Sequence, residues 1–359
     1  MSIADTMSVA ARNAWALTFG PGVEQPDPAP TTVLWDEPHR QLRRFEGADD
    51  GAPTTAQPGV GVLLVPPLAA PASCFDLRAD QSVARFLLGT GRQPYVVDYG
   101  DISFADRRMG VEDWIDEILP EAVLRSSADQ GGAPVDLVGW SLGGTLALLT
   151  AAAHPELPIR SIAAVGSPLD YTELTGIPQL RAAATLTRGL GVSTLVRAVG
   201  GVPATFTRLA YRATALEREL TRPWFIASNL ASTERLARMT TIDRFMADMP
   251  GYPGRFYGQL WGRWVLHNDL GRGVIEFGSR RIALADVTAP VLLVGGTEDA
   301  ITPASAVAAG TRTLRGAASV RYETAPGSHL GILTGPGAAR TTWRYLDEFL
   351  ASTRNAHFG

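Results

Sequence analysis

The sequence predicts an α/β fold, with a mostly parallel, doubly wound sheet and a helical cap inserted before the last two strands. Short apolar runs alternate with longer helical patterns in both the first half and the last quarter of the chain. Between them, from about residue 170 to 275, helical pieces broken by Gly and Pro show no clear strand. Repeated strand–helix units favour a parallel sheet with right-handed crossovers and helices on both faces. A chain of 359 residues, 45% of them hydrophobic, can bury such a core.

The individual elements follow from these patterns. Gly61–Val65 reads as a buried strand that Pro66 and Pro67 stop, because proline cannot donate to a sheet. A proline-rich linker covers residues 21–30. The other predicted strands are 33–35, 41–45, 94–99, 135–140, 160–165, 291–295 and 319–323. The predicted helices are 8–17, 78–89, 111–127, 142–154, 305–315 and 338–352.

These elements suggest three segments. Residues 1–58 form an N-terminal segment with the first strands, 59–167 together with 276–359 form the α/β core, and 168–275 form the cap. Ligands bind at the carboxyl edge of the strands in such sheets. A cap inserted after residue 167 should therefore lie over that edge.

The composition excludes several kinds of site. All 32 basic residues are Arg, which rules out a Lys Schiff base, a P-loop lysine and a Ser–Lys dyad. The single cysteine, Cys74, forms no intrachain disulfide or cysteine metal cage, and the five histidines lack metal-ligand spacing. A net charge of −4 without a block of like charge predicts no nucleic-acid partner. Nothing in the sequence indicates a metal or an organic cofactor.

The sequence shows neither a secretory signal nor a membrane-spanning segment. The N-terminus shows no basic region followed by an apolar run, and no stretch of about 18 apolar residues occurs. We therefore expect a cytoplasmic protein without a transmembrane span.

The motif Gly139-Trp140-Ser141-Leu142-Gly143 lies between a predicted strand and a predicted helix. The apolar run VDLVG leads into the motif, and the helical run TLALLTAAAH leads out of it. G-x-S-x-G in this setting is a nucleophile elbow, whose strained turn lifts the serine Oγ above the sheet. A glycine-rich turn with an incidental serine is the alternative, and the strand–turn–helix context disfavours it. We predict Ser141 as a nucleophile.

A serine nucleophile needs a base. His329 lies in the loop GSHLG just after the last predicted strand, where it can reach the elbow. His267, in the predicted cap, is the serious rival. The alternative role for His329 is that of an ordinary surface-loop histidine.

The base needs a carboxylate that orients it. Asp299 follows the strand 291–295 and gives the chain order Ser, Asp, His. Asp170, which follows the preceding strand, is the alternative, and Glu298 is a weaker one. Either aspartate could instead cap a helix or close a turn.

A tetrahedral intermediate needs backbone N–H donors for its oxyanion. The elbow supplies the N–H of Leu142, and the second donor should come from the loop after the strand 61–65. Because Pro66 and Pro67 have no N–H, Leu68 is the first candidate there, with Ala69 as the second.

Six segments together point to a known family. They are LLVPPLAAPASCFDLR (63–78), SVARFLLGTGRQPYVVDYG (82–100), GWSLGGTLALL (139–149), GSPLDY (166–171), NDLGRGVIEFGSRRIALADVTAPVLLVGGTEDAITP (268–303) and GSHLGI (327–332). Through them the chain resembles the polyhydroxyalkanoate synthase branch of the α/β-hydrolases, above all the shorter synthases that work with a partner subunit. The resemblance extends over about residues 60–335 and implies the α/β-hydrolase fold, an acyl ester or acyl thioester substrate, and a homodimer or a partner subunit.

Two departures from that family change the expected chemistry. The synthases use Cys where this chain has Ser141, and their acid is usually followed by His where Ala300 follows Asp299. An acyl thioester stays activated toward a hydroxyl, whereas an acyl-serine is an oxygen ester that gains almost nothing on transfer to another hydroxyl. Water in large excess then favours hydrolysis. Cys74 lies outside the elbow and resembles a buried small hydrophobe.

The sequence therefore predicts a serine esterase or lipase that cleaves carboxylic esters of acyl substrates through an acyl-Ser141 intermediate. A synthase-like acyltransferase or acyl-CoA thioesterase is the alternative enzyme. A non-catalytic granule-binding or partner-binding protein that kept the fold is the alternative of another class. Trp224, Trp261 and Trp264 in the cap suggest a lipid-like substrate, or else they simply pack the cap.

Overall fold

A mixed eight-stranded sheet forms the centre of the protein. The computed structural model describes residues 2–20, 22–47, 60–175, 177–179, 181, 201–214, 216–278 and 280–357. The strand order is β1-β2-β4-β3-β5-β6-β11-β12. The strands are β1 (Thr31–Glu37), β2 (Arg40–Phe45), β3 (Gly61–Val65), β4 (Gln93–Asp98), β5 (Val135–Trp140), β6 (Ile159–Val165), β11 (Val291–Gly296) and β12 (Val320–Ala325). Within this sheet only β2 runs antiparallel to its neighbours, which confirms the predicted, mostly parallel sheet.

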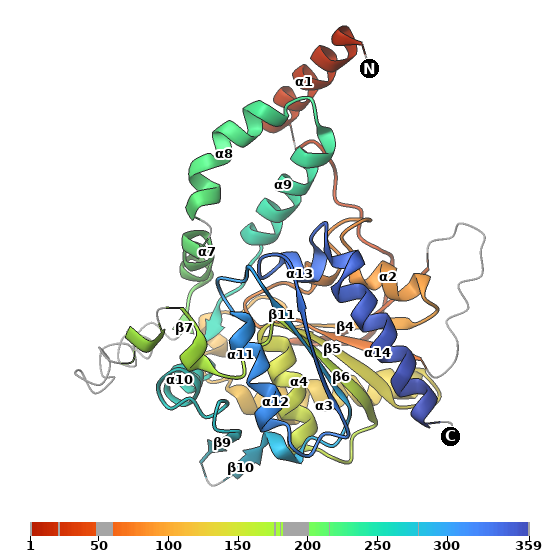
Figure 1. Cartoon of the computed structure of the whole chain (residues 1–359), viewed down its shortest axis with the longest axis vertical. Helices are drawn as coiled ribbons and strands as arrows, with labels where there is room; N and C mark the ends of the chain where they lie inside the picture. The colour runs from red at the N-terminus through yellow and green to blue at the C-terminus, as the bar shows by residue number, and fades with distance from the viewer. Residues whose placement is uncertain are drawn as a thin grey trace.

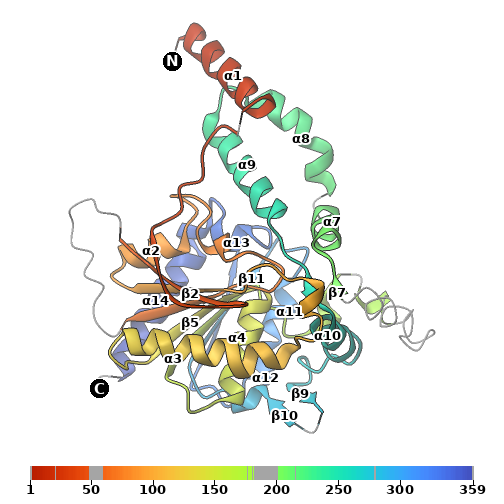
Figure 2. The ribbon, with the colours of Figure 1, turned by 180° about the vertical axis from the view of Figure 1, so that it is seen from behind.

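Helices cover both faces of the sheet (Figures 1 and 2). The helices α3 (Leu119–Asp129), α4 (Leu142–Ala153) and α11 (Ala304–Ala308) bury apolar side chains in one core. The helices α2 (Val83–Gly89) and α14 (Thr342–His357) do so in a second core on the other face. The β3 side chains alternate between the two cores, since successive residues of a strand point to opposite faces. Burial on both faces explains why β3 and β5 read as unbroken apolar runs.

Several helix boundaries differ from the predicted ones. α1 (Ile3–Thr18) is longer than expected, while α2 begins only at Val83 because the Ser82 hydroxyl caps it by accepting from the Arg85 N–H at 2.9 Å. The predicted helix 111–127 contains the π-helical segment η3 (Asp113–Ile118), and 305–315 divides into α11 and α12 (Gly310–Thr313). The shorter elements are α13 (Gly331–Thr334) and the 3₁₀ turns η1 (Ala72–Phe75), η2 (Phe104–Asp106), η4 (Tyr171–Glu173), η6 (Leu284–Asp286) and η7 (Ala338–Arg340).

The region between β6 and β11 is mainly helical where it is described. It holds α7 (Ala204–Thr214), α8 (Leu216–Asn229), α9 (Thr233–Ala247), α10 (Gly254–Gln259) and the π-helical segment η5 (Leu260–Leu266). The expectation of no strand here is wrong. Short strands β7 (Gly201–Val202) and β8 (Tyr252–Pro253) pair, and β9 (Val274–Phe277) pairs with β10 (Arg280–Ala283). Strands of two to four residues are too short to show an alternating pattern. The division into three segments stays a prediction, and residues 182–200 lie outside the described part.

Three helices, α1, α8 and α9, stand out together from one end of the body, and we call them the arm (Figures 1 and 2). The Asn13 side chain of α1 is buried, and its Nδ2 donates to the Leu230 carbonyl at 2.7 Å and to the Thr233 hydroxyl at 3.1 Å. These bonds attach the first helix to the turn between α8 and α9. Within the described residues, no helix is both long and apolar enough to cross a membrane.

An ion-pair cluster links the arm to the body. Arg78 in the loop before α2 bonds Glu234 of α9 at 2.8 Å and Glu24 of the N-terminal linker at 2.9 Å. Arg238 also bonds Glu234, at 2.8 Å. The hydrogen bonds from Arg78 and Arg238 lower the pKa of Glu234 from its ordinary 4.5 to about 2.

This lowered pKa predicts a pH-dependent contribution of Glu234 to stability. A carboxylate with a depressed pKa in the folded state stabilises above its unfolded value and loses that contribution as the pH falls. We expect Glu234→Gln to lower the free energy of unfolding at pH 7 by less than about 1 kcal/mol, because the pair is solvated. In urea unfolding, the difference from the wild type should shrink between pH 4.5 and about 2. A difference that does not change with pH, or an equal loss in the control Glu37→Gln, would contradict this assignment.

Candidate active site

Ser141 occupies a strained turn between β5 and α4. Its backbone φ is 53° and its ψ is −129°, a region that non-glycine residues rarely adopt. Its N–H donates to the Val165 carbonyl at 2.8 Å, which fastens the turn to the neighbouring strand β6. A Cβ on Gly143 would overlap the Val65 carbonyl oxygen, so glycine is required where α4 begins against the end of β3. The predicted nucleophile elbow is therefore present as a backbone geometry.

His329 lies beside Ser141 although 188 residues separate them in the chain. It follows β12, and its Nε2 lies 2.8 Å from the Ser141 Oγ. The side chain is buried, with 4% of the residue exposed. Trp140 positions the residue through two contacts: its indole N–H donates to the His329 carbonyl at 3.1 Å, and the centroids of the Trp140 and His329 rings lie 5.1 Å apart.

Asp299 completes a line of hydrogen bonds. Its Oδ2 lies 2.6 Å from the His329 Nδ1, while its Oδ1 accepts from the N–H groups of Ile301 and Thr302 at 2.9 and 2.8 Å. Both carboxylate oxygens are thus held, and the residue is only 5% exposed. The contacts match a histidine that donates from Nδ1 and accepts the serine proton at Nε2.

The rival residues have other partners. Asp170 accepts from the Thr172 N–H at 2.9 Å and from the Asn268 side chain at 2.9 Å, so it closes a turn next to η4. His267 is exposed at the end of η5. Glu298, next to Asp299, is exposed as well. The geometry brings together Ser141, His329 and Asp299 and leaves these three rivals outside.

The predicted oxyanion donors, the N–H groups of Leu142 and Leu68, lie next to the point where the strand order of the sheet reverses, between β3 and β5. From β3 the chain moves to β4 on one side, and from β5 to β6 on the other. β3 and β5 pair in parallel, with Val65 opposite Gly139, so the loop after β3 lies beside the elbow. Leu142 is the first residue of α4, and Leu68 follows the two prolines. In the described part of the chain, neither of these N–H groups has a backbone acceptor. Crevices at such points are the usual ligand sites, and both N–H groups stay our candidates, with Ala69 as the second choice.

Comparison with known proteins decides the family. The sequence profile of the alpha/beta hydrolase fold family matches residues 113–336, which include all three residues of the hydrogen-bonded line. The protein belongs to the α/β-hydrolase fold family. The monoacylglycerol lipase of Paleococcus ferrophilus has a similar fold, with a TM-score of 0.50 at 18% identity over 82% of this chain and 94% of that one.

Among the relatives of this α/β-hydrolase are poly(3-hydroxyalkanoate) polymerase subunits. A poly(3-hydroxyalkanoate) polymerase subunit PhaC from Allochromatium vinosum is 24% identical over 310 residues, which cover 85% of this chain and 83% of that protein. A PhaC subunit from Synechocystis is 24% identical over 78% of this chain and 74% of its own length. A pimeloyl-[acyl-carrier protein] methyl ester esterase from Neisseria meningitidis is 28% identical over 51% of this chain and 58% of its own. The resemblance to the synthases is thereby confirmed as a distant one over most of the chain.

Two contributors to the site of this α/β-hydrolase were not found from the sequence. Trp140 orients the His329 loop through its indole N–H. The signal in the sequence was weak, because a buried indole usually finds an acceptor but those of Trp114 and Trp264 have none among the described residues. Gly166, at the end of β6, has a φ of 60°, and a Cβ there would lie 3.3 Å from the His329 Cε1. Gly166 matters only because the His329 loop, about 160 residues later in the chain, packs against it, so no local sequence pattern could reveal its role.

The cap tryptophans and the cysteine do not form part of this site. Trp264 is fully buried and packs edge-on against Phe256, Trp261 is buried as well, and Trp224 on α8 is 77% exposed. The first two therefore pack the core, as the alternative interpretation held. Burial raises the pKa of the Cys74 thiol well above its ordinary value, which keeps the thiol protonated. No group of three or more His, Cys, Asp or Glu within the described ranges is arranged to hold a metal ion.

Proposed function

We propose that the protein is a serine hydrolase that cleaves carboxylic esters of acyl substrates. The observation that carries the proposal is the line of hydrogen bonds from the Ser141 Oγ through His329 to Asp299, at 2.8 and 2.6 Å. A buried histidine so held can take the serine proton at the moment of attack. The strained backbone of Ser141 supports this role, since such strain collects at functional sites.

In the proposed mechanism, the Ser141 Oγ attacks the ester carbonyl carbon while its proton moves to the His329 Nε2. The N–H groups of Leu142 and Leu68 bind the oxyanion, and Asp299 stabilises the imidazolium. The carbon–oxygen bond to the alcohol breaks, and the alcohol leaves with the proton from His329. Water, deprotonated by His329, then attacks the acyl-serine and releases the carboxylic acid and Ser141.

The chemistry of oxygen esters supports hydrolysis over polymer formation. An acyl-serine has about the energy of the ester that a hydroxyl acceptor would form, so transfer has little driving force. Water is present in great excess and takes the acyl group downhill. The esterase from Neisseria meningitidis among the relatives is consistent with the same reaction class.

A fluorophosphonate probe tests this assignment directly. We expect the probe to label the native protein on Ser141, because the reagent reacts with serines that a neighbouring histidine activates. Peptide mass spectrometry identifies the labelled residue. The Ser167→Ala variant, which removes another buried serine near the elbow, should be labelled as well as the wild type. Absence of label, or label on another serine, would contradict the proposal.

Acyl transfer is a second candidate, because relatives over most of the chain are polymerase subunits. Incubation with a 3-hydroxyacyl-CoA separates the two reactions by their products. Free hydroxy acid indicates hydrolysis of the thioester, whereas polymer or an acylated acceptor indicates transfer.

A further inference from the structure

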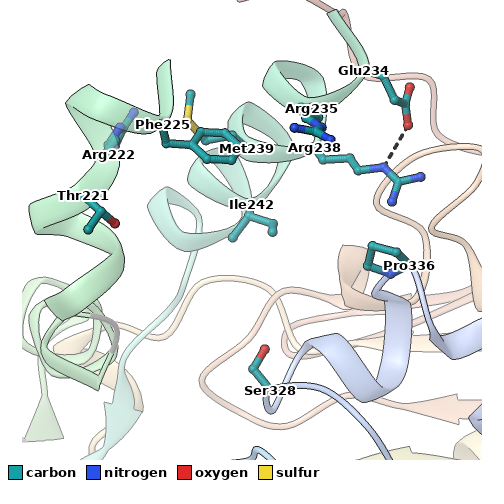
Figure 3. Close-up of a pocket in the computed structure, with 10 residues that line it drawn as sticks. All are labelled: Thr221, Arg222, Phe225, Glu234, Arg235, Arg238, Met239, Ile242, Ser328 and Pro336. Atoms are coloured by element: carbon teal, nitrogen blue, oxygen red, sulfur yellow. Dashed lines mark hydrogen bonds and ion pairs between the residues drawn. The ribbon is translucent and has the colours of Figure 1, made fainter. Parts of the chain in front are cut away.

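A cavity of about 700 Å³ lies between the arm and the loop that carries the candidate base. Figure 3 shows α8 and α9 as its walls, with Ser328 at its floor and Pro336 beside it. Ser328 immediately precedes His329, whose Nε2 contacts Ser141. The described lining consists of Thr221, Arg222, Phe225, Glu234, Arg235, Arg238, Met239, Ile242, Ser328 and Pro336.

One face of α9 runs from the candidate site to the outer end of this cavity. Near the site, Phe245 packs against Trp140, the neighbour of Ser141, with ring centroids 6.2 Å apart. Ile242 and Met239, about one and two turns further out, give the cavity an apolar wall opposite Phe225 (Figure 3). Arg235 follows one more turn out. The ten residues from 235 to 245 span about 15 Å of helix, because each residue rises about 1.5 Å.

The three arginines that line the cavity differ in their partners. Arg222 bonds Asp243 at 2.8 Å, and Arg238 bonds Glu234 at 2.8 Å. Arg235 donates to the side-chain oxygen of Asn229 at 2.9 Å and has no carboxylate partner within the described residues. Its guanidinium keeps further N–H donors for a ligand, in a planar arrangement suited to a carboxylate or phosphate.

We propose that this cavity binds the acyl chain of the substrate and that Arg235 recognises an anionic group, a carboxylate or a phosphate, at the far end of that chain. The inference rests on the proposed function, in which the ester carbonyl sits at Ser141. The apolar stretch between the two ends then matches a long, mainly aliphatic chain. The substrate class is an acyl ester that is anionic at its distal end, rather than a plain fatty ester.

The test compares hydrolysis of matched esters. The anionic probe is the 4-nitrophenyl monoester of a long α,ω-dicarboxylic acid, and the neutral probe is the same ester with its free carboxylate methylated. A third probe carries a terminal phosphate and shows which anion is preferred. We expect the wild type to show kcat/KM about tenfold higher for the anionic probes, as one charge-assisted contact allows.

Arg235→Gln should lower the anionic-to-neutral ratio of kcat/KM about tenfold, toward one. Arg12→Gln, which removes an exposed arginine of the arm outside the cavity, should leave the ratio unchanged. Equal rates on all probes in the wild type, or an unchanged ratio in Arg235→Gln, would overturn the inference.

Binding separates this inference from the proposed reaction. Calorimetry with the Ser141→Ala protein and the monomethyl ester of the same dicarboxylic acid measures the cavity without turnover. We expect Kd to rise about tenfold when Arg235→Gln is added. A Kd that Arg235→Gln does not change overturns the cavity assignment. If the wild type hydrolyses none of the esters but ligand binding still depends on Arg235, the assignment of the cavity stands and only the proposed reaction is wrong.

Discussion

Ser141→Ala is expected to lower kcat about a million-fold for a medium-chain nitrophenyl ester, because among the described residues the Ser141 Oγ is the nucleophile that contacts the His329 Nε2. The change removes one oxygen and keeps the Cβ, so the strained turn and the buried surroundings of residue 141 remain. Steady-state kinetics measure the loss. The remaining activity reflects only oxyanion stabilisation and substrate binding.

Ser167→Ala is the matched control for this change. Ser167 is also buried, and its hydroxyl bonds only weakly, at 3.4 Å, to the Val165 carbonyl. We expect kcat within a few-fold of the wild type, together with a similar unfolding curve. Unchanged turnover in Ser141→Ala, or an equal loss in Ser167→Ala, would remove Ser141 from the mechanism.

Asp299→Asn should lower kcat about ten-thousand-fold. The asparagine amide can present an N–H to the His329 Nδ1 where the carboxylate presents an acceptor, which favours the wrong tautomer of the imidazole. It also leaves no negative charge to stabilise the imidazolium. The kinetics should show the loss in kcat with little change in KM, since Asp299 lies behind the histidine.

Asp170→Asn separates the two candidate acids. Asparagine at 170 can still accept the Thr172 N–H through its side-chain oxygen, so the turn next to η4 should persist. We expect a loss of less than about tenfold, because Asp170 does not contact His329. A larger loss in Asp170→Asn than in Asp299→Asn would reverse the assignment of the acid.

The elbow was predictable because its signal is local. An apolar strand, a serine between glycines and a helix of small residues occupy consecutive positions in the sequence. The structure gives the reason for the glycines, because β5, α4 and β3 approach one another too closely there for a Cβ. The two partners of Ser141 were harder. Both Asp170 and Asp299 follow strands, β6 and β11, that are neighbours in the sheet. Both therefore reach the same edge, and only loop geometry decides which one meets the histidine.

The arm could not be derived from the sequence. The described side chains of α1 and α8 bury little, and α9 has both buried and exposed positions, so periodicity predicts that these segments are helical without showing how they pack. The contact between Asn13 and the turn at Leu230 joins positions 217 residues apart. The cavity next to Arg235 exists only because this arrangement places α8 and α9 over the His329 loop.

The docking of α1 onto α9 also sets an order of events during synthesis. At about 5–20 residues per second, the ribosome needs roughly 10–40 s to add the residues between Asn13 and its partners. Until then the helix Ile3–Thr18 lacks the partners that hold Asn13 at the turn between α8 and α9, and its Met7 and Trp15 side chains remain exposed even after it has docked. Removal of α1 should therefore change the yield of folded protein in the cell more than it changes the turnover of the protein that has folded.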